Sequence, residues 1–396
     1  MSSETTGRKA FKANIATAEG ILNGGTVVVA DGIIEAVYAA DESPDHLDCE
    51  VIEGGDGFLV PGFIDVHVHG GYGHDFMEAS AEAYEAITSF HGRNGTTRML
   101  ATTVTAPKEA IDAVLACTND TIARQSNGGS RGAKLQGVHL EGPFISPKWP
   151  GAQNPAFIVP PQKSWVQDWT ARYPGLVKLL TLAPEEEGAL ETIEHACGCG
   201  IVCACGHTNA SYAQLLAAAD KGLRHAVHTF NAMTGLHHRE PGTVGAVMTD
   251  DRIFAEVIAD GHHVHPAAIE LLTRAKPQDR LLLVTDAISA AGLGDGEYSL
   301  GGLAVTVRDG VARLTHGGSL AGSTLTMIGA FRFMVERIGL SIVDASRLAS
   351  ANPAKVLGIG QTAGTIAAGK AADLVLLAPD LSINAVYSEG SVIHSV

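Results

Sequence analysis

Six residues that could bind a metal ion or move a proton stand at the ends of apolar, strand-length runs in this sequence. They are His67, His69, Glu141, His207, His228 and Asp286. Imidazole nitrogens and carboxylate oxygens are ligands that zinc and ferrous iron accept. A carboxylate beside a metal-activated water can take its proton and return it to a leaving group. The six residues therefore predict a metal-dependent hydrolytic site in which Asp286 is the general acid/base.

Three of these residues, His67, His69 and Asp286, also have a purely structural interpretation. His67 and His69 alternate with valines in VPGFIDVHVHGG, residues 60–71, so on a strand both rings would project from one face. Such a pair could equally be hydrogen-bonded in the core, and Asp286 could cap a helix at a strand-to-helix turn. Buried polar groups need partners, however. A metal ion would supply a single, shared partner for the groups at five strand ends.

Eight apolar runs of strand length should position these residues. They begin at residues 63, 97, 135, 177, 201, 224, 254 and 281, about 23 to 42 residues apart. The stretches between them, such as 81–92 and 212–222, have the apolar spacing of helices. Repeated strand–helix units with right-handed crossovers close into a (β/α)8 barrel, whose catalytic groups sit at the carboxyl ends of the strands. We therefore predict an α/β protein with a TIM-like barrel over residues 63–355.

The sequence has β character on both sides of this barrel. Residues 13–58 contain short β-prone runs with a hairpin signal at Asp31-Gly32, and the segment after residue 363 is β-prone as well. Because these parts bracket the barrel, we predict a small β-sandwich satellite domain built from residues 1–62 and 356–396. A second hairpin signal, VRDGVARL at 307–314, predicts a β excursion after the eighth strand.

Composition excludes several classes of partner. The chain has 396 residues, 45% of them hydrophobic, and a formal net charge of −16. This charge argues against nucleic acid and against anionic membranes, which require a basic face. No apolar run approaches the roughly 18 to 20 residues of a membrane span, and MSSETTGRKAFK lacks the apolar core of a signal peptide. We expect a cytoplasmic protein in which local cations meet any anionic substrate.

Four of the six cysteines lie close together in CGCGIVCACGH, residues 197–207. A structural zinc site is one interpretation of this cluster. Such sites usually carry their cysteines on turns, whereas Cys203 and Cys205 belong to an apolar run that reads as a buried strand. We favour small, reduced core residues.

Several motifs give the chain a resemblance to the amidohydrolase superfamily, and within it to the deacetylases of phosphorylated amino sugars. PGFIDVHVHG and GKAADLV occur throughout the superfamily, whereas HLEGPF (139–144), HTFNAM (228–233) and LAGSTLTM (320–327) are more specific. The resemblance implies hydrolysis of the acetamide of N-acetyl-D-glucosamine 6-phosphate to D-glucosamine 6-phosphate and acetate. It also implies a homodimer and one or two divalent metal ions per subunit.

The resemblance assigns roles to particular residues. Glu141, His207 and His228 would hold the essential ion, expected to be zinc with iron, manganese or cobalt as alternatives. His67 and His69 would add a second ion, bridged to the first through Glu141. Arg239 would meet the sugar phosphate, in some members across a dimer interface. The complete set of implied substrate contacts is Ala152, Gln153, Asn231, Ala232, Arg239, Asp260, Gly261, His262, His263, Leu320, Ala321 and Gly322.

Gln153 departs from the family pattern, which often has a histidine at this position to help polarise the substrate carbonyl. Glutamine can donate a hydrogen bond but cannot carry a charge. Carbonyl activation would therefore depend more on the metal site in this chain.

Two other functions are consistent with the same residues. One is an amidohydrolase for a cyclic amide or a nucleobase, but many such enzymes bridge two metals with a carboxylated lysine, and no lysine ends VKLLTLA at 177–183. The other is a metal-binding scaffold without turnover, against which the presence of Asp286 argues.

Overall fold

Eight parallel strands form the central sheet of the computed structural model, which describes residues 7–43, 47–128 and 132–396. Each predicted apolar run supplies one of them, and neighbours in sequence are neighbours in the sheet. The (β/α)8 barrel expected from the sequence is confirmed. Its strands are β5 (Phe63–Asp65), β8 (Thr96–Thr102), β9 (Lys134–Glu141), β10 (Val177–Leu182), β11 (Val202–Cys205), β12 (His225–Ala226), β13 (Phe254–Val257) and β14 (Leu281–Leu283).

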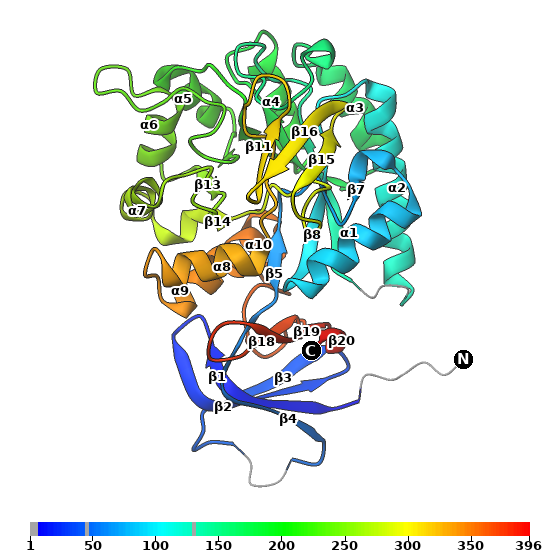
Figure 1. The fold of residues 1–396 in the computed structure, drawn as a ribbon, viewed down its shortest axis with the longest axis vertical. Coiled ribbons are helices and arrows are strands. Elements are labelled where there is room, and N and C mark those ends of the chain that lie inside the picture. The colour runs from blue at the N-terminus through cyan, green and yellow to red at the C-terminus, as the bar shows by residue number, and fades with distance from the viewer. Residues whose placement is uncertain (1–6, 44–46, 129–131) are drawn as a thin grey trace.

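A helix follows each barrel strand, and together these helices surround the sheet (Figure 1). The predicted helical stretches 81–92 and 212–222 correspond to α1 and α5. The eight helices are α1 (Ala81–Arg93), α2 (Lys108–Ser126), α3 (Lys163–Arg172), α4 (Ala189–Gly198), α5 (Tyr212–Asp220), α6 (Gly242–Thr249), α7 (Pro266–Ala275) and α8 (Met327–Glu336). Two shorter helices follow, α9 (Ile342–Ser346) and α10 (Asn352–Val356), separated by the π-helical segment η4 (Arg347–Ala351).

The first and last barrel strands are joined through the segments that follow them. The backbone N–H of Asp286 donates to the carbonyl of His67 at 2.8 Å, and the Thr285 hydroxyl donates to the carboxylate of Asp65 at 2.6 Å. β5 ends at Asp65, so His67 and His69 lie just beyond the strand. The expectation that they alternate on the strand itself is wrong, although the backbone N–H of Thr102 in β8 still donates to the carbonyl of Val68, between them, at 3.1 Å.

Strands from both sides of the barrel build the satellite domain, which lies below the barrel in Figure 1. The predicted pairing of the two ends of the chain is confirmed, because β18 pairs with β4 in one seven-stranded order. The backbone N–H of Ile34 donates to the carbonyl of Lys370, and the N–H of Ala372 donates to the carbonyl of Gly32. These two hydrogen bonds bring the turn at Gly32 close to the segment that leads into β18. The strands, in sheet order, are β20 (Ser391–Ser395), β19 (Ile383–Ser388), β18 (Leu374–Leu377), β4 (Glu50–Pro61), β1 (Lys9–Ala16), β2 (Ile21–Ala30) and β3 (Ile33–Tyr38). The division at residues 62/63 and 355/356 stays a prediction.

Both hairpin signals form hairpins. Asp31 and Gly32 have φ of 50° and 79°, and Asp309 and Gly310 have φ of 51° and 73°, the left-handed geometry of a tight hairpin turn. The second turn joins β16 (Leu303–Arg308) to β17 (Val311–Leu314), and β15 (Gly296–Leu300) completes this three-stranded excursion between β14 and α8. The remaining elements are β6 (Gly70–Gly71), β7 (His74–Asp75), η1 (Phe76–Glu78), η2 (Pro155–Phe157) and η3 (Gln278–Arg280).

Asp373, just before β18, connects the satellite to the barrel. Its carboxylate accepts a hydrogen bond from Arg98 of β8 at 2.6 Å and another from the backbone N–H of Glu389 at 2.9 Å. Its carbonyl accepts from Gly62 at 2.8 Å. The Arg98 and Asp373 side chains are only 11% and 4% exposed, so this ion pair is largely withdrawn from water. Among the described residues, no helix is both long enough and apolar enough to cross a membrane.

Candidate active site

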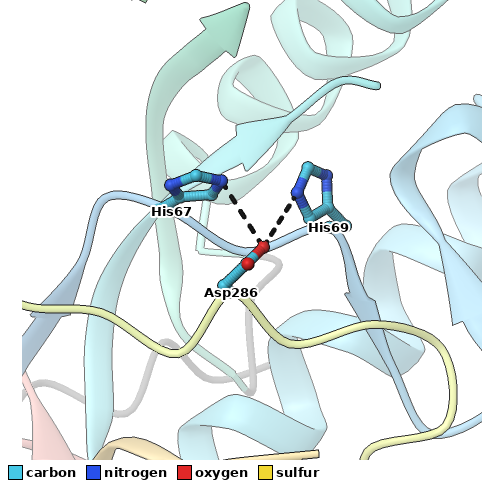
Figure 2. A group of neighbouring side chains, drawn as sticks. All are labelled: His67, His69 and Asp286. Carbon is cyan, nitrogen blue, oxygen red and sulfur yellow. Dashed lines mark ion pairs between the residues drawn. The ribbon is translucent and has the colours of Figure 1, made fainter. Parts of the chain in front are cut away.

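The six predicted residues converge at the carboxyl ends of the barrel strands. They form two groups, one of His67, His69 and Asp286 (Figure 2) and one of Glu141, His207 and His228. Within each group the candidate ligand atoms lie within 4.8 Å of one another, and all six residues are buried. Residues separated by more than two hundred positions in sequence therefore share one site.

Glu141 lies between the two groups. One of its oxygens is 3.0 Å from Nε2 of His228, 3.3 Å from Nε2 of His207 and 3.3 Å from Nε2 of His67. The other oxygen is 3.3 Å from Nε2 of His69. The carboxylate of Asp286 completes the first group, 3.1 Å from His69 and 3.5 Å from His67. This is the arrangement expected if Glu141 bridges two ions.

The chemistry of the donors fits a divalent metal ion. Nε2 of His207 and Nε2 of His228 lie 3.2 Å apart, so both nitrogens cannot comfortably carry protons. Nε2 of His67 is buried and makes no hydrogen bond. Buried imidazole nitrogens and carboxylate oxygens gathered around one point match the ligand set of zinc or iron sites. The donors do not distinguish between these metals.

Unusual backbone geometry directs three of these side chains. His207, His228 and Asp286 have φ of 47°, 30° and 50°, in a left-handed region that residues other than glycine rarely adopt. Such residues cost about 1 to 3 kcal/mol each and concentrate at functional sites. The carbonyl of Asp286 is fixed by the N–H of Ser323 at 2.7 Å. No helix in the described chain begins at Asp286, so the helix-cap alternative is wrong.

Charges of both signs stabilise each other in the site. Burial raises the pKa of Asp286 and Glu141, but the charge of His67 and hydrogen bonds from neighbouring histidines outweigh it and lower both values. Burial lowers the pKa of His69, yet hydrogen bonds to Asp286 and Glu141 raise it to about 9. Both carboxylates are therefore ionised at neutral pH, and Asp286 is a base ready to accept a proton.

Buried polar residues behind the ligands were not identified from the sequence. Glu256 in β13 contacts His67 and His225, each at 2.8 Å. His139 in β9 bonds the carbonyl of Val66 at 3.1 Å and the Thr181 hydroxyl at 2.8 Å. The available signal was a charged or polar residue within an apolar strand, as in FAEV for Glu256.

A cavity of about 450 Å³ opens over the two groups. Seven of the twelve implied substrate contacts line it, namely Ala152, Gln153, Asn231, Ala232, His263, Leu320 and Gly322. Lys148, Trp149, Leu300 and Ser319 line it as well and were not identified from the sequence. Lys148 is the notable addition, because it brings a cation to a site in an acidic protein.

The other five implied contacts do not line this cavity. Arg239 is exposed, with its guanidinium 2.8 Å from Nε2 of His238, and His262 is exposed too. Ala321 is fully buried. Asp260 and Gly261 belong to the turn that immediately precedes His263 in the sequence. The carboxylate of Asp260 contacts Nδ1 of His263 at 2.6 Å, so Asp260 can act through that histidine.

Gln153 is held in a single orientation. Its side-chain oxygen accepts from the backbone N–H of Thr105 at 2.7 Å, which leaves the amide NH2 to donate to Glu141 at 2.6 Å. The amide that replaces the family histidine therefore supports the central carboxylate of the site.

The cysteines stay outside this chemistry. All six are free, and Cys203 and Cys205 are buried in β11. Where the chain is described, no cluster with metal-ligand spacing contains a cysteine, so the structural-zinc alternative finds no support.

Fold and site together define a (β/α)8-barrel enzyme of the metal-dependent hydrolase class, with its ligands on the carboxyl rim. The model of the Amidohydrolase family matches residues 58–393. This chain belongs to the amidohydrolase family.

Named relatives resemble the chain over nearly its whole length. N-acetylglucosamine-6-phosphate deacetylase of Bacillus subtilis (strain 168) is 39% identical, over 96% of this chain and 95% of that protein. N-acetylgalactosamine-6-phosphate deacetylase of Escherichia coli O157:H7 is also 39% identical, over 94% and 96% respectively. A mutant N-acetyl-D-glucosamine-6-phosphate deacetylase from Mycobacterium smegmatis, in complex with N-acetyl-D-glucosamine-6-phosphate, superimposes with a TM-score of 0.90 at 35% identity. That match covers 98% of this chain and 100% of the other.

Proposed function

We propose that this protein hydrolyses the acetamide of N-acetyl-D-glucosamine 6-phosphate, giving D-glucosamine 6-phosphate and acetate. The observation that carries the proposal is the joined pair of ligand groups on the barrel rim, open to a cavity of about 450 Å³. The similarity to named deacetylases over nearly the full chain supplies the substrate class.

The ligand groups suggest where ions would be held. Glu141, His207 and His228 would hold one ion, and His67, His69 and Asp286 would surround a second, with zinc as the proposed metal. A bound divalent cation supplies Lewis acidity towards an amide carbonyl and towards water. Gln153 would help by holding the Glu141 carboxylate in place.

Asp286 would move the proton during hydrolysis. Its carboxylate is ionised and adjoins the cavity, so it can accept a proton from the attacking water. It can then deliver this proton to the sugar nitrogen as the C–N bond breaks, which converts a poor leaving group into a neutral amine. Water thus contributes OH to acetate and H to the amine.

The sugar phosphate requires cations in a chain with a net charge of −16. We assign this role to Lys148, which lines the cavity together with His263, a ring that Asp260 orients. Arg239 is exposed and outside the cavity, so in our proposal it contributes across the interface of a homodimer. Six unpaired cysteines suit a cytoplasmic enzyme, which is the location we propose.

N-acetyl-D-galactosamine 6-phosphate is a second candidate substrate. The relative named for it in Escherichia coli O157:H7 is as similar to this chain as the Bacillus subtilis protein is. The two sugars differ only in the configuration at C4, away from the acetamide. The same catalytic residues would serve both.

Acetate release from both phosphosugars and from unphosphorylated N-acetylglucosamine would test the proposal, using protein whose metal content has been counted. We expect metal-dependent release with strong preference for N-acetyl-D-glucosamine 6-phosphate. Preference for N-acetyl-D-galactosamine 6-phosphate would change the proposed substrate and leave the proposed reaction, hydrolysis of the acetamide, unchanged. No release by metal-loaded protein would refute the deacetylase proposal and favour a cyclic amide or a scaffold without turnover.

A further inference from the structure

We propose that Glu256 is a positioning residue that prepares the group of His67, His69 and Asp286 to bind its metal ion. Glu256 lies in β13 and is completely buried. One carboxylate oxygen is 2.8 Å from Nδ1 of His67 and also accepts from the backbone N–H of His228 at 3.2 Å. The other is 2.8 Å from Nε2 of His225. The inference rests on the metal-ligand roles proposed above but not on the substrate.

These contacts decide which nitrogen of His67 faces the site. A carboxylate only accepts hydrogen bonds, so in the neutral form of the ring that binds a metal ion, Nδ1 of His67 carries the proton and Nε2 offers its lone pair. That nitrogen is buried, has no hydrogen-bond partner, and lies 3.3 Å from Glu141 and 3.5 Å from Asp286. A carboxylate behind a metal-binding imidazole fixes its tautomer and orientation and increases its basicity.

The other ligand histidines lack such a side chain. Nδ1 of His207 bonds the backbone carbonyl of Trp149 at 3.0 Å, and Nδ1 of His69 and of His228 has no hydrogen-bond partner. Over the ranges that the structure describes, Glu256 is thus the only side chain outside the two ligand groups that hydrogen-bonds the ring of a ligand histidine. The two ligand groups should therefore differ in their dependence on this residue.

Glu256 touches the second group only through the amide of His228. Its removal should weaken the ion at His67 much more than the ion at His207 and His228. Glu256→Ala removes every acceptor, whereas Glu256→Gln keeps an oxygen for His67 in a side chain of the same shape. The two variants separate loss of orientation from loss of charge.

Metal titration of stripped protein would test this inference. Wild type, Glu256→Ala and Glu256→Gln would be titrated with Co²⁺ and Zn²⁺ by calorimetry and visible absorption, and bound ions counted after gel filtration. We expect wild type to bind two ions, and Glu256→Ala to bind one normally and the other about 10- to 100-fold more weakly, as for other residues behind metal ligands. Glu256→Gln should recover part of this affinity.

Two comparison variants identify the affected ion. His67→Gln should weaken the same ion as Glu256→Ala. Glu185→Gln is a matched control, because Glu185 accepts hydrogen bonds from Thr208 and Asn209 near the other group without touching an imidazole of the site. It should leave the affinity of the His67 ion unchanged.

Unchanged affinity for both ions in folded Glu256→Ala and Glu256→Gln would overturn the inference. A wild type that binds one ion, retained by His67→Gln, would overturn it as well. If circular dichroism shows that Glu256→Ala does not fold, the metal affinities of Glu256→Gln decide whether the inference holds. Acetate release is measured separately, so a two-metal protein without deacetylase activity would refute the proposed function and leave this inference standing.

Discussion

At the scale of single residues, the mechanism that we propose requires Asp286 to be ionised while it is buried. Burial raises the pKa of Asp286, but the positive charge of His67 and the hydrogen bond from His69 outweigh it and lower this pKa. The same residue adopts a left-handed backbone that turns it towards the histidines in Figure 2. Charge and geometry thus prepare it as a proton acceptor beside the cavity.

Asp286→Asn should therefore lose turnover while the chain keeps its fold. The amide has the same shape but cannot accept the proton, so we expect kcat to fall by about 100-fold or more. The ion at Glu141, His207 and His228 should remain, since Asp286 is not in that group. Steady-state kinetics and metal counting on one preparation would check both points, and near-normal kcat would remove Asp286 from the mechanism.

Lys148→Met should weaken recognition of the phosphate. A charge-assisted hydrogen bond contributes about 1.5 to 3 kcal/mol, so we expect KM for the phosphorylated sugar to rise by about 10-fold or more. Activity on the unphosphorylated sugar should change little. Lys163→Met is the matched control, because Lys163 is exposed at the start of α3 and away from the cavity. Equal effects of both substitutions would argue against a specific role for Lys148.

The rim residues could be predicted from sequence because each one ends an apolar run, and the barrel brings the ends of parallel strands together. Glu256 and Lys148 could not. Glu256 lies inside an apolar run, and only the fold shows that it stands behind His67. Lys148 belongs to a loop whose path over the cavity depends on contacts distant in sequence, such as the one between Trp149 and Asn209.

At the scale of elements, the segment from Leu320 to Ser323 fixes the end of the eighth strand. Ser323 exchanges backbone hydrogen bonds with the segment at Asp286 and Ile288, at 2.7 and 3.0 Å. Gly322 has φ of 55°, and a Cβ there would lie 2.4 Å from a methyl of Ile288 and 2.9 Å from the Asp286 carbonyl. This segment, which contributes Leu320 and Gly322 to the cavity, is therefore tightly coupled to the backbone of Asp286.

Gly322→Ala should displace Asp286 as well as lower stability. We expect a loss of about 1 to 3 kcal/mol in the free energy of unfolding, from backbone strain and the collision, together with reduced kcat. Gly310→Ala shares the left-handed φ, but its Cβ would meet nothing closer than 3.9 Å. This control should lose about 1 kcal/mol and keep normal kcat. Urea unfolding and kinetics would compare them, and full activity in Gly322→Ala would contradict the coupling.

The eight strands were predictable as elements because their apolar runs and spacing are properties of the local sequence. Their ends were not. β5 stops at Asp65 and β12 contains only His225 and Ala226, and where a strand ends depends on the path of neighbouring strands that are distant in sequence. The turns at Asp31-Gly32 and Asp309-Gly310 were predictable because their geometry depends on two adjacent residues.

At the scale of the whole molecule, metal binding should stabilise the fold. A ligand that binds only the native state at about 100 times its dissociation constant adds about 2.7 kcal/mol. Chelation should therefore lower Tm, and zinc should restore it. Magnesium should restore little, because it prefers oxygen ligands to imidazoles. Calorimetry would measure these changes, and a Tm insensitive to chelation of a metal-loaded preparation would contradict the proposed site.

Asp373→Ala should destabilise the protein because it removes the side chain that links the satellite to Arg98 of the barrel. Removing one partner of a buried ion pair typically costs about 3 to 5 kcal/mol. Arg98 would keep its longer contacts to Glu389 at 3.4 Å and to Gln136 at 3.3 Å, so we expect a loss at the lower end of this range. Glu194→Ala removes the exposed ion pair to Lys221, whose side chains are 64% and 44% exposed, and should cost less than about 1 kcal/mol. Denaturant unfolding would compare the two, and equal losses would show that Asp373 has no special role.

The satellite sheet also imposes an order on folding. Leu374 of β18 pairs with Pro61 of β4, and the whole barrel lies between them in the chain. During synthesis, β1 to β4 therefore leave the ribosome with one edge of β4 unpaired until the barrel has been made. Contacts this distant in sequence form slowly, and an open edge of this kind can pair with other chains. The nascent protein should be most prone to aggregation in this interval, long before its catalytic groups have assembled.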